Sequence, residues 1–200
     1  RAFGTALIAI LLAAASGPAP ALRAQGDANQ VVPANAYKDL KWRSVGATRG
    51  GRVTAYSGVR QQPHTFYMGA TGGGVWKSDD AGLSWVPVGD GQIATGSIGS
   101  IDVAPSNPNH VWVGTGSAAI RSNVIIGRGV YKSLDAGKTW TTIMTGMPTF
   151  AEDGLGRIGI TVAPSLPSRL FATVDAGSKS GIYRSDDAGA SWTRVNADPR

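Results

Sequence analysis

Short runs of alternating apolar and polar residues, separated by turns rich in glycine, proline and asparagine, make up most of the chain after residue 46. Such alternation is typical of β-strands that bury one face. This pattern occurs three times, and each repeat contains one polar turn. Three runs precede the turn and a fourth follows it, so every repeat is predicted to supply four antiparallel strands. The two upstream strands are expected at residues 52–56 and 65–68, 100–104 and 110–113, and 158–162 and 169–172.

The polar turns are octamers of the pattern Ser-x-Asp-Ala-Gly-x-Ser/Thr-Trp, at residues 78–85, 133–140 and 185–192. An aspartate in a tight turn accepts backbone N–H bonds, and glycine adopts a positive φ that other residues avoid. The tryptophan that heads the next strand is bulky enough to pack between neighbouring sheets. The predicted structural residues are therefore Asp80, Gly82, Trp85, Asp135, Gly137, Trp140, Asp187, Gly189 and Trp192.

The octamers recur about every 50 residues, which is the size of one four-stranded propeller blade. The predicted fold class is all-β, a partial β-propeller of four-stranded antiparallel blades at about residues 47–91, 92–146 and 147–200. Residues 41–46 match the outermost strand that follows each octamer, so residues 37–46 are expected to be the outer strand that closes the ring. Since three blades do not close a ring, further blades are expected beyond Arg200.

The N-terminal region differs from the repeats. Residues 6–15 form an apolar run of signal-peptide length that is too short to span a bilayer. We therefore expect a signal peptide at residues 1–24, a linker at 25–36, and export to the periplasm or the outside of the cell, with no membrane span once the signal is removed. The chain has no cysteine, which excludes disulfides and thiolate metal sites.

Charge and isolated histidines narrow the classes of ligand. The formal net charge of +6 is spread along the chain without a Lys/Arg-rich run, which argues against nucleic acid as a partner. His64 and His110 each stand alone at a turn, so no metal site is expected. Residues 72–74 are all glycine but join two strands and lack the Lys-Ser/Thr pair of a phosphate loop, so no cofactor is expected.

The octamers resemble the Asp box of the bacterial neuraminidase repeat, and the resemblance covers about residues 37–200. That repeat is shared by sialidases, xyloglucanase-type glycosidases, photosystem II assembly factors and sortilin-type propellers, so it implies the fold more than an activity. Residues 49–53 (Arg-Gly-Gly-Arg-Val) and 69–78 look like the opening of large exported sortilin-like propeller proteins of bacteria.

In propellers of this kind, the loops between the second and third strands share one face with the loops that enter the innermost strands, and the Asp boxes lie on the opposite rim. We expect the first of these faces to bind the ligand. Its candidate residues are Arg49, Arg52, Thr71, Arg121, Arg128 and Arg157. Guanidinium groups together with the nearby carboxylates suit an acidic or polyhydroxylated ligand.

The resemblance also sets expectations for catalysis. The Phe/Tyr-Arg-Ile-Pro motif of sialidases does not occur before the first octamer. Xyloglucanase-type enzymes carry a catalytic aspartate in a Thr-Asp-x-Gly-Gly stretch, and the best match to its position here is Thr71, whose hydroxyl cannot act as a general base. The remaining catalytic candidates are Asp153 and Asp175, with partner carboxylates beyond Arg200.

Two main functions stay open on the sequence. The first is an extracytoplasmic propeller module that binds a protein, peptide or glycan without chemistry, which the missing motifs favour. The second is a xyloglucanase- or sialidase-like glycoside hydrolase whose catalytic carboxylates are split across the ring, about 5 to 9.5 Å apart. A role as an assembly factor follows only from the resemblance to photosystem-type propellers.

Overall fold

The computed structural model describes Ala36, Lys38 and residues 52–117 and 126–196. The chain divides into two units, Arg1–Trp42 and Arg43–Arg200, and every strand of the described residues belongs to the second. Apart from Ala36 and Lys38, the expected signal peptide, linker and closing strand lie outside the described residues, and so do Arg49 and Arg121.

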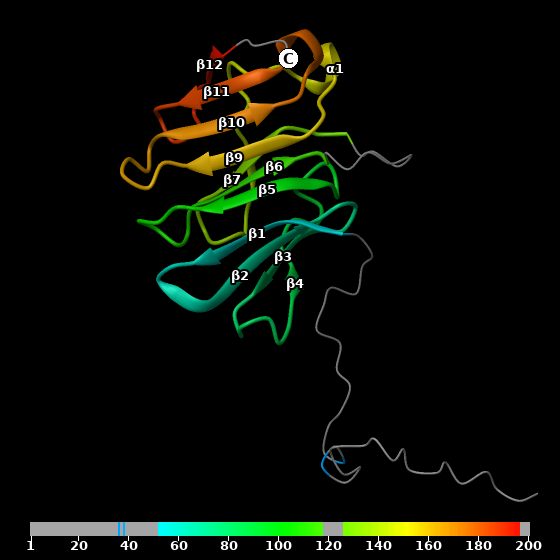
Figure 1. The fold of residues 1–200 in the computed structure, drawn as a ribbon, viewed down its shortest axis with the longest axis vertical. Coiled ribbons are helices and arrows are strands. Elements are labelled where there is room, and N and C mark those ends of the chain that lie inside the picture. The colour runs from blue at the N-terminus through cyan, green and yellow to red at the C-terminus, as the bar shows by residue number, and fades with distance from the viewer. Residues whose placement is uncertain (1–35, 37, 39–51, 118–125, 197–200) are drawn as a thin grey trace, which may run out of the picture. The chain divides into compact units, whose positions relative to one another are not determined.

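Within the described residues, the strands form three four-stranded antiparallel sheets, each with its strands in chain order (Figure 1). The first blade comprises β1 Val53–Val59, β2 Gln62–Ala70, β3 Gly74–Ser78 and β4 Val86–Pro87. The second comprises β5 Ile98–Val103, β6 Val111–Thr115, β7 Val130–Ser133 and β8 Thr141–Thr142. The third comprises β9 Ile158–Val162, β10 Leu170–Val174, β11 Gly181–Ser185 and β12 Thr193–Asn196.

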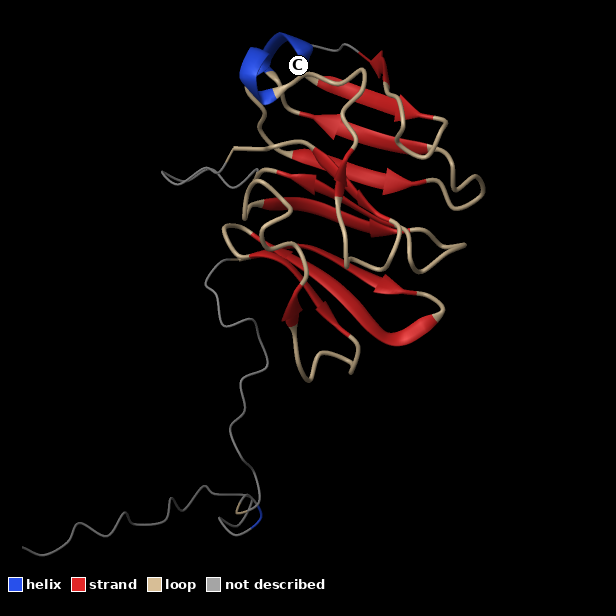
Figure 2. Ribbon diagram, turned by 180° about the vertical axis from the view of Figure 1, so that it is seen from behind, coloured by secondary structure: helices blue, strands red, loops and turns tan. Residues whose placement is uncertain are grey.

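Within residues 52–117 and 126–196, the helical segments are α1 Phe150–Asp153 and a 3-10 turn at Gly177–Lys179 (Figure 2). Thr149 caps α1 by accepting the Glu152 backbone N–H. The prediction of an all-β fold built from four-stranded antiparallel blades is confirmed.

The apolar core lies between the blades. One cluster joins the first blade to the second, with Tyr67 packed among residues such as Ile98, and the other joins the second to the third through Trp112 and Leu170. Because the second blade has a neighbour on both of its faces, every residue of β6 is buried and the alternation expected of a half-exposed strand disappears. Burial of these apolar faces is the main favourable contribution to the stacking of the blades.

A network of hydrogen bonds inside each octamer fixes the turn. The Asp80 carboxylate accepts bonds from the Ser84 backbone N–H at 2.9 Å, the Ser84 hydroxyl at 2.6 Å and the Ser78 hydroxyl at 2.8 Å. The Ser78 hydroxyl in turn accepts the Gly82 N–H at 2.8 Å. The other two octamers repeat the same bonds around Asp135 and Asp187, so the aspartates stabilise turns.

The backbone of the octamer turns departs from the expectation in one respect. The glycine has a positive φ, as expected, but the alanine before it also does, with values of 58°, 59° and 57° at Ala81, Ala136 and Ala188. The N–H of each alanine donates to a backbone carbonyl of its own blade: that of His64 near the start of β2, of Asn109 between β5 and β6, or of Ser168 between β9 and β10. Each bond joins the octamer turn to the beginning of the second strand or to the turn before it, and offsets the cost of the left-handed conformation.

Each octamer tryptophan of the second and third blades bonds to the preceding blade. The indole N–H of Trp140 donates to the Val88 carbonyl at 2.7 Å, and that of Trp192 donates to the Ile143 carbonyl at 3.0 Å. Both indoles are buried, as predicted for tryptophans packed between sheets. Trp85 of the first blade is only partly buried, because no sheet of the described residues covers its side.

The octamer carboxylates make stability depend on pH in the acid range. Hydrogen bonds, chiefly from the hydroxyl four residues later, lower the pKa of Asp80, Asp135 and Asp187 from 3.8 to about 2. Since the folded pKa lies below the unfolded one, their contribution is complete above about pH 4 and is lost as the pH falls toward 2. Asp135→Asn is expected to lower the urea midpoint at neutral pH and to reduce its further fall on acidification, while Glu152→Gln on α1 leaves the profile of the wild type. Parallel acid profiles for Asp135→Asn and the wild type would contradict this account.

The close approach of the first two blades predicts a steric effect at Gly69. A Cβ on Gly69 would overlap Cγ2 of Ile98 in the second blade. Gly69→Ala is therefore expected to cost about 1–3 kcal/mol in the free energy of unfolding, measured by urea denaturation. Gly58→Ala is the matched control, because its Cβ would meet the Phe66 ring at 3.4 Å, and its change is expected to stay within about 0.5 kcal/mol. Equal midpoints for the two variants would refute close blade contact at Gly69.

Candidate functional site

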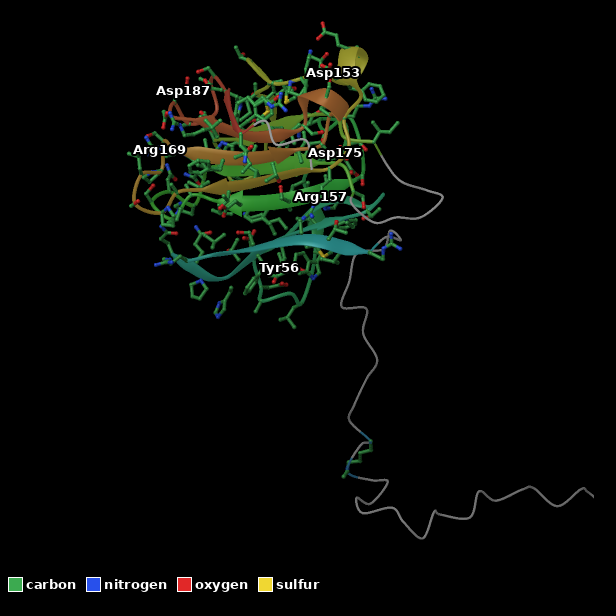
Figure 3. The ribbon with its side chains drawn as sticks, turned by 45° about the horizontal axis from the view of Figure 1, so that its top comes forward. Tyr56, Asp153, Arg157, Arg169, Asp175 and Asp187 are labelled. Atoms are coloured by element: carbon green, nitrogen blue, oxygen red, sulfur yellow. The ribbon has the colours of Figure 1, made fainter. Side chains whose placement is uncertain are left out.

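The two ends of the blades carry different sets of residues. Asp153, Arg157 and Asp175 lie at one end of the strands, whereas Arg169 and Asp187 lie at the other (Figure 3). The first end is formed by the connections between second and third strands and by those between blades. We call it the loop face, and its described residues are 71–73, 88–97, 116–117, 126–129, 143–157 and 175–180.

Thr71 lies directly after β2 and is 8% exposed. Its hydroxyl oxygen lies 3.4 Å from that of Ser117, and its backbone N–H donates to the Arg52 carbonyl at 2.8 Å. A buried hydroxyl paired with another hydroxyl has neither the acidity nor the access of a catalytic carboxylate. Thr71 is therefore a buried residue that packs at the edge of the loop face.

Asp175 occupies in the third blade the position that Thr71 occupies in the first. The backbone N–H of Thr71 donates to the Arg52 carbonyl, and that of Asp175 donates to the Arg157 carbonyl at 3.2 Å. Both residues directly follow the strand that pairs with the third strand of their blade. The repeat thus places an exposed carboxylate at an equivalent point two blades away from Thr71.

The surroundings of Asp175 leave its carboxylate accessible. Asp175 is exposed, and no cation among the described residues forms an ion pair with it. Gly156 lies against it, so that a Cβ on residue 156 would overlap the carboxylate, and the Gly156 N–H donates to the Asp175 carbonyl at 2.8 Å. The carboxylate therefore packs against the backbone at Gly156 and has no ion-pair partner among the described residues.

Asp153, the other candidate carboxylate, forms an ion pair with Lys179. Its Oδ2 lies 3.0 Å from the Nζ of Lys179, and its side chain is only 13% exposed. The hydrogen bond and charge of Asp153 raise the pKa of Lys179. This ion pair joins α1 to the 3-10 turn, so Asp153 has a structural partner that Asp175 lacks.

The arginines among the sequence candidates that the structure describes differ in what they contact. Arg52 is exposed. The Arg128 guanidinium stacks on the Phe150 ring, 3.7 Å from its centroid. The Arg157 side chain donates to the Gly99 carbonyl of the second blade at 3.3 and 3.2 Å, which ties the second and third blades together.

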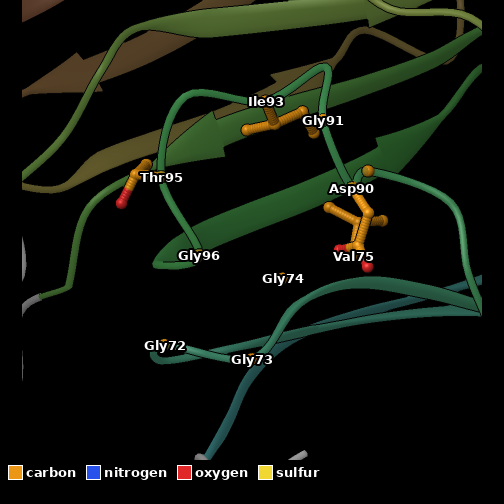
Figure 4. A pocket seen from close by; sticks show the side chains of 10 residues that line it. Gly72, Gly73, Gly74, Val75, Asp90, Gly91, Ile93, Thr95 and Gly96 are labelled. Atoms are coloured by element: carbon orange, nitrogen blue, oxygen red, sulfur yellow. The ribbon is translucent and has the colours of Figure 1, made fainter.

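A cavity of about 140 Å³ opens on the loop face between the first and second blades (Figure 4). Its wall consists of Gly72, Gly73, Gly74, Val75, Gly89, Asp90, Gly91, Ile93, Thr95 and Gly96. Because most of these residues have no side chain, the ligand would meet backbone N–H and C=O groups together with the polar groups of Asp90 and Thr95. The sequence candidates did not include this cavity, although the glycines at 72–74, 89 and 91 are a signal of close backbone approach.

The described residues contain neither a metal-binding cluster nor a membrane-spanning helix. Among them, no group of three or more His, Cys, Asp and Glu side chains is placed to hold a metal ion. In the same residues, no helix is long and apolar enough to cross a membrane.

Curated proteins that are similar to this chain include two xyloglucanases. A probable oligoxyloglucan-reducing end-specific xyloglucanase of Neosartorya fischeri is 35% identical over 151 residues, which are 71% of this chain and 16% of that protein. The oligoxyloglucan-reducing end-specific xyloglucanase of Emericella nidulans is 34% identical over 147 residues, 70% of this chain and 16% of its own length. The chain therefore spans only 16% of the relatives it matches. No family model matches it.

Solved structures establish the architecture. An ancestral GH74 enzyme superposes with a TM-score of 0.56 at 21% identity, over 74% of this chain and 19% of that one. The GH74 enzyme of Niastella koreensis gives a TM-score of 0.54 at 23% identity, over 74% and 23% of the two chains. The chain is a segment of a β-propeller. These likenesses confirm the propeller part of the resemblance drawn from the octamers and give no specific support to its sortilin-like part.

Proposed function

We propose that the chain is part of a glycoside hydrolase propeller whose loop face binds a polysaccharide of the xyloglucan class. The observation that carries the proposal is the identity of 35% and 34% to two xyloglucanases over about 70% of the chain. The loop face adds an exposed carboxylate and a glycine-walled polar cavity. This reading takes precedence over the non-catalytic binding module that the missing sequence motifs favoured.

The chemistry of glycoside hydrolysis requires two carboxyl groups on opposite sides of the scissile bond. We assign Asp175 as the one contributed by this chain, because it is exposed, unpaired by any described cation and located at a strand end of the loop face. Asp153 is less suited, since Lys179 already neutralises it. The second carboxyl group is assigned to residues outside the described part of the chain.

The loop face suits an uncharged, polyhydroxylated ligand. Backbone N–H and C=O groups around the cavity present donors and acceptors at short range, as the hydroxyl groups of a sugar require. The guanidinium groups of Arg128 and Arg157 are already engaged by a ring and a carbonyl, so they do not form an obvious receptor for an acidic ligand. We also place the protein outside the cytoplasm, which is supported by the apolar run at residues 6–15.

A second candidate function is glycan binding without hydrolysis. It is favoured by Thr71, which stands where xyloglucanase-type enzymes are expected to carry a catalytic aspartate and whose hydroxyl is buried against Ser117. A propeller that has lost this carboxylate would keep the sugar-binding surface and lose turnover.

Turnover by the full-length polypeptide that contains this chain separates the two functions. We expect it to release reducing ends from xyloglucan, and Asp175→Asn to lower kcat about 100-fold or more with little change in KM, because a general acid or base contributes about 10²–10⁴-fold. Glu152→Gln, a carboxylate at the same end of the blades, serves as the control and is expected to retain full activity. Binding without turnover would establish the second candidate, and the absence of both on a xyloglucan and β-glucan panel would overturn the proposal.

The environment of Thr71 predicts a structural effect without a catalytic one. Thr71→Val removes the hydroxyl that faces Ser117 and is expected to cost about 1 kcal/mol in unfolding free energy. Turnover on xyloglucan is expected to stay within about twofold of the wild type, since a neutral hydroxyl has no role in proton transfer here. Thermal denaturation and initial rates measure both quantities, and a tenfold loss of kcat with unchanged stability would show that the hydroxyl takes part in the reaction.

A further inference from the structure

The glycine-walled cavity of the first blade has an equivalent place in the second blade, and backbone hydrogen bonds identify it. Val75 accepts the Val88 N–H and Val130 accepts the Ile143 N–H, at 2.9 Å in both blades. Val88 and Ile143 each lie three residues after the octamer tryptophan of their blade. The residues that directly follow Val88 and Ile143 therefore occupy equivalent positions.

These equivalent residues are Gly89 in the first blade and Met144 in the second. The same turn follows both, because the backbone N–H three residues later donates to the carbonyl of Gly89 at 3.2 Å and to that of Met144 at 2.9 Å. The glycine two residues later has a positive φ in each turn, 73° at Gly91 and 86° at Gly146. The two blades thus share one backbone path here and differ in the side chain.

The side chain of Met144 occupies in the second blade the space that corresponds to the cavity. Its Sδ accepts the Val130 N–H at 3.1 Å, and a Cβ on Gly129 would lie 3.0 Å from both its Cγ and its Sδ. At Gly74, the equivalent of Gly129, a Cβ would meet only the Asp90 carboxylate, at 3.6 Å. An unbranched side chain with a hydrogen-bond acceptor along it therefore fits this place in the repeat.

The first blade leaves the same place open. Gly89 offers the Val75 N–H no side-chain acceptor, and the two residues line the cavity of about 140 Å³ together with Ile93 (Figure 4). A Cβ on Gly91, in the same wall, would meet no atom within 4 Å, so this side of the cavity is accessible from the loop face. The first blade thus has a cavity where the second blade has a buried thioether.

We propose that this cavity binds the methionine side chain of a peptide partner, which enters from the loop face and accepts the Val75 N–H through its sulfur atom. Met144 identifies the occupant, because it makes this bond at the equivalent place of the same repeat. A thioether is a weak acceptor, and its flexible, unbranched chain adapts to irregular cavities. The inference goes beyond the proposed hydrolysis and does not depend on it, since Asp175 lies in the third blade.

Saturation-transfer NMR on the full-length polypeptide that contains this chain tests the proposal, with N-acetyl-methionine methylamide as the probe. We expect transfer to the probe's ε-methyl group and a dissociation constant of about 10 mM, because one buried side chain supplies the whole interaction. The norleucine probe lacks the acceptor and is expected to bind about three- to tenfold more weakly. The leucine probe branches where the Met144 chain passes Gly129, and is expected to give no saturable transfer. Equal binding of all three probes would overturn the proposal.

Two variants place the binding in the cavity. Gly89→Met fills the cavity from within and is expected to lower transfer to the methionine probe at least about tenfold, with a urea midpoint no lower than that of the wild type. The double variant Gly89→Met/Met144→Gly moves the open space to the second blade and is expected to restore the transfer. Undiminished transfer in Gly89→Met contradicts the proposal, and so does a double variant that unfolds cooperatively and binds no probe.

A xyloglucan oligosaccharide, used as a separate probe on the same proteins, distinguishes a glycan from a peptide in the cavity. We expect its transfer to be the same in the wild type and in Gly89→Met, because the proposed occupant is a thioether. If its transfer falls in Gly89→Met while the methionine probe gives none with the wild type, the cavity binds the glycan and the proposal of a peptide partner is wrong.

Discussion

Packing of each blade on the one before it is the interaction on which the rest of this structure depends. The apolar face of a blade covers the innermost strand of its neighbour, as Tyr67 and Ile98 show, and the octamer tryptophan locks the contact with one indole bond. A four-stranded sheet of this size has too little core of its own, so burial between sheets supplies the stability. The same dependence explains why Val53 and Tyr56 are exposed on the side of the first blade that no sheet of the described residues covers.

Stacking also determines which end of the blades is available for function. The octamer turns and the segments bonded to them occupy one end. Their polar side chains already form hydrogen bonds within the turn, as the Asp135 carboxylate does with Thr139. The opposite end is left with connections of varied length that carry Asp175, the Asp153–Lys179 pair and the glycine-walled cavity. Rigid blades beneath these loops hold them in place, which is the arrangement that binding and catalytic sites commonly use.

The repeat explains why one strand-end position has different chemistry in different blades. Thr71 and Asp175 have the same backbone bond to the residue that precedes the first strand of their blade, yet one is buried against Ser117 and the other faces solvent beside Gly156. The repeat therefore gives the two blades the same backbone arrangement at this position. Whether the position carries a carboxyl group depends on the side chain present in each blade. Of the two candidate carboxylates for the proposed hydrolase, Asp153 pairs with Lys179, whereas Asp175 has no ion-pair partner among the described residues.

Much of the architecture follows from the sequence alone, because strand alternation and the octamer pattern are local signals. The four strands of each blade, the turns around Asp80, Asp135 and Asp187, and the burial of Trp140 and Trp192 were all readable from spacing and residue type. Contacts that join distant residues needed the tertiary structure, since nothing local in the sequence places Lys179 beside Asp153, Arg157 on the Gly99 carbonyl or residues 72–74 against residues 89–96. For the same reason Trp85 and Trp140 look alike in the sequence, and only the presence or absence of a neighbouring blade makes one partly exposed and the other buried.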